Sequence, residues 1–129
     1  MRILKNKWFQ RFAKKENLTD ASLREAVGRA TSGVVDANLG AGVIKQRVAR
    51  PGEAKAKGYR TIIFFRKGAL AIFVFGFSKS KKSNLTYREE NAFKEAAKHL
   101  LSLPEISIDT LVENGELIEV SENEQEVSQ

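Results

Sequence analysis

The sequence predicts a small α+β domain in which an antiparallel β-sheet carries an N-terminal helical hairpin and a C-terminal helix. Three observations indicate this class. Apolar residues recur at helical spacing near both ends of the chain, β-branched and aromatic runs fill its middle, and glycines separate those runs. The 129 residues, 42% of them hydrophobic, suffice for one domain with a modest core.

The N-terminal part of the chain predicts a short strand followed by two helices. Residues 2–4 can form the strand, and a helix over 6–16 follows. Three aromatic side chains of this helix share one face and are expected in the core: Trp8, Phe9 and Phe12. A second helix should begin at Thr19, whose hydroxyl can cap it, and end at Gly33. We therefore expect a helical hairpin.

Three strands are predicted in the middle of the chain. The run VIKQRVAR over residues 43–50 alternates between apolar and basic positions, which indicates a half-buried strand with its basic side chains on one face. The runs over 59–66 and 69–78 are rich in β-branched and aromatic residues and predict a hairpin at the middle of the sheet. Its second strand should be buried on both faces, and Gly76 should mark a bulge or a close backbone approach.

The last third of the chain predicts a capped helix, a short helical segment and an edge strand. Thr86 and Glu89 have the capping-box spacing at the start of the helix, which must end before Pro104. The buried face of this helix is expected to consist of Ala92, Phe93, Ala96, Ala97 and Leu100. Residues 107–114 can add one or two helical turns, and residues 116–120 can form the edge strand.

Charge is distributed unevenly along the chain. All 22 Lys and Arg residues precede Pro104, and the charged residues that follow it are acidic. We expect one domain at residues 1–120 and a disordered acidic tail at residues 121–129. The basic excess of the domain is typical of a surface that binds phosphate groups, although it could simply maintain solubility. Nucleic acid is a better partner than a membrane, because no long amphipathic helix accompanies the charge.

Composition also argues against several kinds of site. The chain has no Cys, which excludes disulfides and thiolate metal sites, and its one histidine, His99, cannot form a metal cluster by itself. We expect no metal and no other cofactor, and we expect His99 to be structural or on the surface. Basic residues interrupt the N-terminal segment every few positions, so neither a secretory signal nor a membrane span is predicted. The protein is expected to be cytoplasmic.

The order of the predicted elements and three phrases within them resemble a known family. The phrases are KQRVARPGEAKAKGYRT, FVFGFSKSKKSN and GELIEV. Together they resemble RelE-type toxins of the RelE/ParE superfamily, and within it the HigB-like branch, over the chain up to Val120. The resemblance implies a RelE-like fold and a metal-independent endoribonuclease. Such an mRNA interferase is a hydrolase that cuts mRNA, commonly at the ribosome, inhibits translation and arrests growth. It also implies a cognate antitoxin, with a helix-turn-helix DNA-binding domain, as partner.

Cleavage of RNA by its own 2′-hydroxyl requires a proton acceptor, positive charge around the phosphate, and help for the departing 5′-oxygen. Lysine and arginine must supply these here, because His99 is distant in sequence from the basic phrases. By the resemblance, Lys45 and Lys82 are the candidates for proton transfer. The candidates for binding and stabilising the scissile phosphate are Arg47, Arg60 and Lys79. Further RNA contacts are expected from Lys55, Lys57, Lys81 and Tyr87.

The assignments leave alternatives open. Lys45 and Arg47 could be the solvent face of an antiparallel strand, and the lysines of the loop over 78–85 could prevent edge aggregation. The loop also departs from the family pattern, since Ser80 stands where an arginine is common and Tyr87 is one position out of step. The chain could be a non-catalytic toxin of this fold that binds a protein target such as gyrase, or a plain RNA-binding domain. The acidic tail could shield the basic site in cis.

Overall fold

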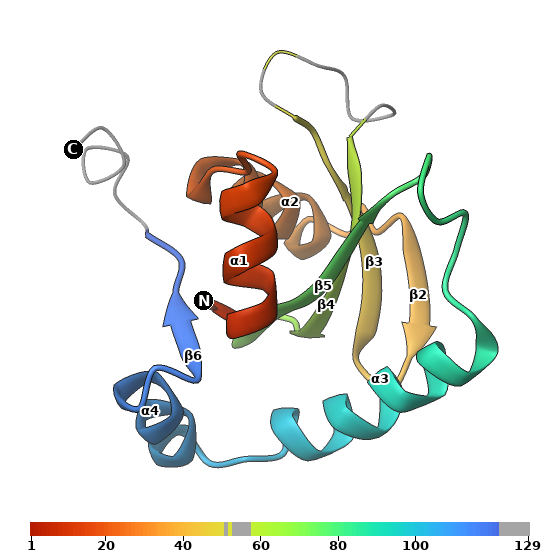
Figure 1. The fold of residues 1–129 in the computed structure, drawn as a ribbon. Coiled ribbons are helices and arrows are strands. Elements are labelled where there is room, and N and C mark those ends of the chain that lie inside the picture. Colours follow the sequence, from red (N-terminus) through yellow and green to blue (C-terminus); the bar gives the residue numbers. More distant parts are fainter. Residues whose placement is uncertain (51, 53–57, 122–129) are drawn as a thin grey trace.

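The computed structural model describes residues 1–50, 52 and 58–121, and within them one sheet is flanked by helices (Figure 1). The strands are β1 (Arg2–Asn6), β2 (Ala37–Gly40), β3 (Val43–Val48), β4 (Tyr59–Arg66), β5 (Leu70–Ser78) and β6 (Leu117–Glu119). The helices are α1 (Lys7–Lys15), α2 (Asp20–Thr31), α3 (Tyr87–Leu101) and α4 (Glu105–Glu113). The predicted α+β class is confirmed. The predicted tail lies outside the described residues from residue 122 onward.

The sheet has the strand order β2-β3-β4-β5-β1-β6. The predicted hairpin of β4 and β5 is at its middle, and β3 pairs antiparallel with β4. Strand β1 is the exception to the antiparallel pattern, because it lies parallel to β5, with Leu4 beside Ile72. The predicted edge strand is β6, which pairs with β1. Strand β2 was not predicted, since its four residues, ANLG, have low strand propensity and its ladder is irregular between Asn38 and Gly40.

Helices cover both faces of the sheet. Helices α1 and α2 form the expected hairpin on one face, where Phe9 and Leu23 pack with Phe73 of β5. Helices α3 and α4 pack on the other face, where Ala97 and Ile108 join a second core cluster that includes residues of β4 and β5. Strand β5 is consequently buried on both faces, as predicted. This leaves charged side chains room only at the ends of the central strands.

Two predicted helical faces are only partly right. In α3, Ala97 is fully buried and Phe93 and Leu100 are partly buried, whereas Ala92 and Ala96 are exposed. This helix therefore packs along a narrower stripe than the sequence predicted. In α1, Phe9 is buried and Phe12 is partly buried, but Trp8 is 38% exposed. Trp8 lies at the start of α1, next to the part of β5 with which β1 no longer pairs, so β1 does not cover it.

Gly76 is a close-approach position, one of the two alternatives that the sequence left open. A Cβ built on Gly76 would lie 2.5 Å from Cε2 of Phe12, so the ring of Phe12 occupies the space that a side chain would need. The irregularity in the β4–β5 ladder lies nearby but elsewhere, between Phe73 and Phe75, where Val74 is the additional residue. Glycine thus permits α1 to pack directly against the backbone of β5.

A buried glutamine connects α2 to β3. Gln46 has no exposed surface, and its Nε2 donates to the backbone oxygens of Ala26 and Val34 at 2.9 and 3.1 Å. Its Oε1 accepts from the backbone N–H of Asp36 at 2.8 Å. The amide therefore satisfies its own hydrogen-bonding needs and those of the segment after α2. It fixes Asp36 beside β3.

The effect of a side chain at Gly76 tests this packing. We expect Gly76→Ala to lower the free energy of unfolding by about 1–3 kcal/mol, because the added methyl group overpacks the contact with Phe12. Gly28→Ala is the matched control: a Cβ there meets no atom within 4 Å, and alanine should stabilise the interior of α2 by about 0.5–1 kcal/mol. Urea unfolding of both variants measures the difference. Effects of the same sign would contradict the tight packing over Gly76.

The predicted capping box of α3 provides a second test. Thr86 accepts from the backbone N–H of Glu89, and the Glu89 carboxylate accepts from that of Thr86. This backbone hydrogen bond, and next the ammonium of Lys82, lower the pKa of Glu89 below its ordinary value of 4.5. A carboxylate whose pKa is lower in the folded state contributes stability above its ordinary pKa and loses that contribution as the pH falls through the folded-state value.

We therefore expect Glu89→Gln to lower the free energy of unfolding at neutral pH and to flatten its decline below pH 4.5. Urea titrations at a series of pH values measure both effects. Glu95→Gln is the control, because Glu95 lies on the same helix with an exposed side chain and no role in the cap. A difference between Glu89→Gln and the wild type that persisted unchanged at acidic pH would contradict the assignment.

Candidate functional site

A basic hollow with a volume of about 230 Å³ lies at the end of β3 and β4. Side chains from both strands line it, together with the residue before β2, the first residue of β2 and residues of the segment after β5. We call it the cationic hollow, and its lining residues are Asp36, Ala37, Lys45, Arg47, Arg60, Lys79 and Ser83. The structure thus brings together four of the five residues predicted for catalysis, which are Lys45, Arg47, Arg60 and Lys79.

Strand register explains why these residues converge. Arg47 lies directly opposite Arg60 in the antiparallel ladder, so both side chains are on the same face of the sheet. Lys45 is two residues before Arg47 and therefore shares that face. The face is the one that α3 covers, but α3 packs near Phe64, further along β4. Among the described residues, α3 therefore does not cover the end of β4 that carries Arg60.

The cationic hollow is electrostatically prepared for an anion. Like charges directly opposite each other destabilise a sheet, and Arg47 and Arg60 are such a pair. Lys45 adds a third cation, and its Nζ donates to Oδ1 of Asn84 at 3.0 Å, which holds the side chain at the rim. A phosphate group between the two arginines could accept several charge-assisted hydrogen bonds.

Asp36 is a residue of the cationic hollow that sequence reasoning missed. Its Oδ2 accepts from the backbone N–H of Arg47 at 2.6 Å and lies 3.8 Å from Nη1 of Arg29. Among the described lining residues it is the one carboxylate. No signal in the sequence could have identified it, because it precedes the unpredicted strand β2 and is positioned by the side chain of Gln46.

The loop after β5 separates the lysines that the sequence grouped together. The backbone N–H groups of Lys81 and Lys82 both donate to the carbonyl oxygen of Ser78, which forms a tight turn. Lys79 consequently lines the cationic hollow, whereas Lys81 lines a different hollow beside α1. Lys82 is outside both, with its Nζ 2.9 Å from Oε1 of Glu89.

The remaining predicted RNA contacts do not join the cationic hollow in the described structure. Tyr87, the first residue of α3, is 81% exposed and does not line this hollow. Lys55 and Lys57 lie outside the described residues. His99 is exposed on α3. In the part of the chain that the structure describes, no three His, Cys, Asp or Glu side chains are grouped to hold a metal ion. No helix of that part has the length and apolar character to cross a membrane.

Comparison with known proteins identifies the family. No curated protein matches the chain. A family model does match, over residues 1–120, and it describes the RelE toxin of the RelE/RelB toxin–antitoxin system. The matched range includes every residue that lines the cationic hollow. The chain therefore belongs to the RelE family, the toxins of toxin–antitoxin systems.

Proposed function

We propose that the chain is an endoribonuclease of the HigB-like branch that cleaves mRNA at the ribosome, inhibits translation and is silenced by an antitoxin with a helix-turn-helix domain. The observation that carries the proposal is the convergence of Lys45, Arg47, Arg60 and Lys79 on one hollow. An anionic polymer is the ligand that such a hollow favours. Membership of the RelE family supports RNA as that polymer and an antitoxin as the protein partner.

The proposed reaction uses the RNA as its only reactant, and the protein supplies groups that carry protons. The 2′-hydroxyl oxygen of one nucleotide attacks the adjacent phosphorus and loses its proton to a base. The bond between phosphorus and the 5′-oxygen breaks, and an acid protonates that oxygen. The products are a 2′,3′-cyclic phosphate and a 5′-hydroxyl end. Charge accumulates on the non-bridging oxygens during attack, so cations fixed around them lower the barrier.

The positions of the side chains suggest a division of roles. Arg47 and Arg60 face each other across the β3–β4 ladder and can hold the phosphate from two sides. Lys79 can add a third positive charge from the loop after β5. Lys45 and the carboxylate of Asp36 are the candidates for accepting the proton of the 2′-hydroxyl. All of these groups line the same hollow.

Induced expression in a bacterium, with mapping of the 5′ ends of cellular mRNA, tests the function. We expect growth arrest and new cuts inside translated messages, and at least a 100-fold loss of cleavage in Arg60→Ala. Lys79→Ala is a second test variant, because Lys79 is in an exposed loop where substitution leaves the core intact. Lys67→Ala is the charge-matched control, since Lys67 lies in the exposed turn between β4 and β5.

The outcomes separate the alternatives. Arrest without cuts would contradict the nuclease and indicate a protein target such as gyrase. Absence of both growth arrest and RNA cleavage would favour the alternative that the chain is a plain RNA-binding domain. Equal cleavage by Arg60→Ala, Lys79→Ala and Lys67→Ala would show that the cationic hollow is not the catalytic site.

Single-turnover cleavage of ribosome-bound mRNA by the purified protein tests the proton-transfer candidates. We expect Lys45→Ala to lower the rate by about 100-fold or more, because Lys45 lines the cationic hollow. Lys82→Ala should change it only severalfold, because Lys82 pairs with Glu89 outside the hollow. Asp36→Asn tests the other candidate base. The asparagine oxygen can still accept from the backbone N–H of Arg47, but the carboxylate charge is removed. A large loss of cleavage rate in Lys82→Ala, with little loss in Lys45→Ala, would indicate that Lys82 and not Lys45 transfers the proton.

A further inference from the structure

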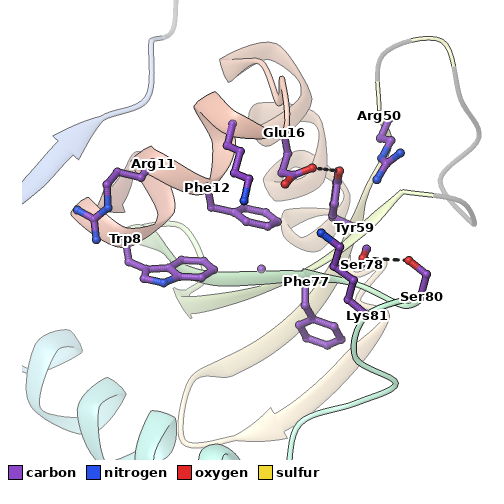
Figure 2. A pocket seen from close by; sticks show the side chains of 12 residues that line it. Trp8, Arg11, Phe12, Glu16, Arg50, Tyr59, Phe77, Ser78, Ser80 and Lys81 are labelled. Atoms are coloured by element: carbon purple, nitrogen blue, oxygen red, sulfur yellow. Dashed lines mark hydrogen bonds between the residues drawn. The ribbon is translucent and has the colours of Figure 1, made fainter.

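A second and larger hollow, of about 390 Å³, lies between α1 and the end of β5 (Figure 2). Strand β1 pairs with β5 only as far as Phe73, so beyond that residue α1 flanks the strand. We call this space the aromatic hollow and define it by Trp8, Arg11, Phe12, Lys15, Arg50 and Lys81. Its volume is within the range of pockets that bind small organic groups. The proposed function makes no use of it.

The aromatic hollow has a preformed flat wall. The rings of Trp8 and Phe12 are stacked, with centroids 5.2 Å apart and planes 15° from parallel. Trp8 also contacts the ring of Phe75 at 4.6 Å, which limits its motion. Because Gly76 has no side chain, Phe12 packs against the backbone of β5. Trp8 nevertheless remains 38% exposed and lines the hollow, so part of its indole is accessible to a ligand.

The charges around this wall favour an anionic ligand. Four cations line the aromatic hollow, and Glu16 is the carboxylate among its described lining residues. Glu16 is already engaged, since it accepts the hydroxyl of Tyr59. The guanidinium of Arg50 lies over the Tyr59 ring, 4.7 Å from its centroid. Among the described residues, no carboxylate is within ion-pair distance of Arg11, Lys15 or Lys81.

The two hollows lie on opposite faces of the same end of the β4–β5 hairpin. Tyr59 and Arg60 are consecutive in β4, so their side chains point to opposite faces. Tyr59 lines the aromatic hollow and Arg60 the cationic hollow. The turn at Ser78 divides the next loop in the same way, with Lys81 on one side and Lys79 on the other. A flexible polymer bound at one hollow can therefore continue around the end of the hairpin to the other.

We propose that the aromatic hollow binds one nucleotide of the single-stranded RNA whose scissile phosphate occupies the cationic hollow. This inference rests on the proposed function. The base stacks on the exposed ring of Trp8, and the adjoining phosphates contact Lys81 and Arg11. Stacking on an aromatic wall beside cations is the arrangement that binds single strands without strict sequence preference. An acidic peptide would satisfy the cations but would use the flat ring surface only where it carries an aromatic side chain.

The fluorescence of Trp8 provides a direct test, because it is the one tryptophan of the chain. The probe is a short oligoadenylate with 2′-O-methyl riboses, which cannot be cleaved because the attacking hydroxyl is blocked. We expect this RNA to quench Trp8 when it binds to the full-length protein. In Trp8→Leu, which keeps an apolar contact with Phe75, the affinity measured by anisotropy of the labelled probe should fall about 5- to 100-fold.

Lys81→Ala tests the phosphate contact. The slope of log affinity against log salt should decrease by about 0.7, as expected for one lost contact to a single strand. Lys67→Ala removes the same charge from the opposite end of the hairpin and should leave the slope, the affinity and the quenching unchanged. A slope that decreased equally in Lys67→Ala would mean that Lys81 contributes only to general attraction, and would overturn the assigned contact.

Two further results would overturn the proposal. One is binding of the labelled probe without quenching of Trp8. The other is quenching by the antitoxin but not by RNA, which would assign the hollow to a protein. These failures are distinguishable from failure of the proposed function. If the wild-type protein cleaves mRNA but RNA does not quench Trp8, the proposed nuclease function stands and the nucleotide site is contradicted. If RNA quenches Trp8 but no mRNA is cleaved in cells, the nucleotide site stands and the nuclease function is contradicted.

Discussion

The alternation of side chains along β4 is the constraint on which both candidate binding surfaces depend. Helices cover the two faces of this central strand, so its interior must be apolar or internally satisfied. Thr61 shows how strictly this holds, since it is fully buried and its hydroxyl donates to the carbonyl oxygen of Gln46. Polar groups can reach a ligand only at the two ends of the strand, and Tyr59 and Arg60 lie at its first end. They lie on opposite faces, and each becomes part of a different hollow.

Buried hydrogen bonds connect the β3 wall of the cationic hollow to the core behind it. Gln46 lies between Lys45 and Arg47, points to the opposite face, and binds the middle of α2 and the segment that carries Asp36. Asp36 in turn accepts from the backbone of Arg47. Positioning charge before the substrate arrives is what allows fixed cations to stabilise a developing phosphorane without reorganisation.

Local patterns in the sequence predicted what local physics determines. Period-two alternation placed Lys45 and Arg47 on one face, and the spacing of Thr86 and Glu89 predicted the capping box. Features that depend on pairing between distant segments could not be predicted from the sequence. The parallel β1, the opposition of Arg47 and Arg60, and the position of Asp36 all depend on register or on contacts across the fold. The loop after β5 has no period, so nothing in the sequence could separate Lys79, Lys81 and Lys82 before the turn at Ser78 was known.

If the proposed reaction takes place in the cationic hollow, its side chains require that the RNA be positioned accurately. Lysine and arginine are weak proton carriers at neutral pH compared with histidine, and the histidine of this chain is elsewhere, on α3. A site with modest acid–base power gains most from holding the 2′-oxygen, phosphorus and 5′-oxygen in line. Binding energy from a part of the RNA that does not react can supply that alignment. Under the proposed function, the aromatic hollow could provide it, because the consecutive residues Tyr59 and Arg60 of β4 link the two hollows.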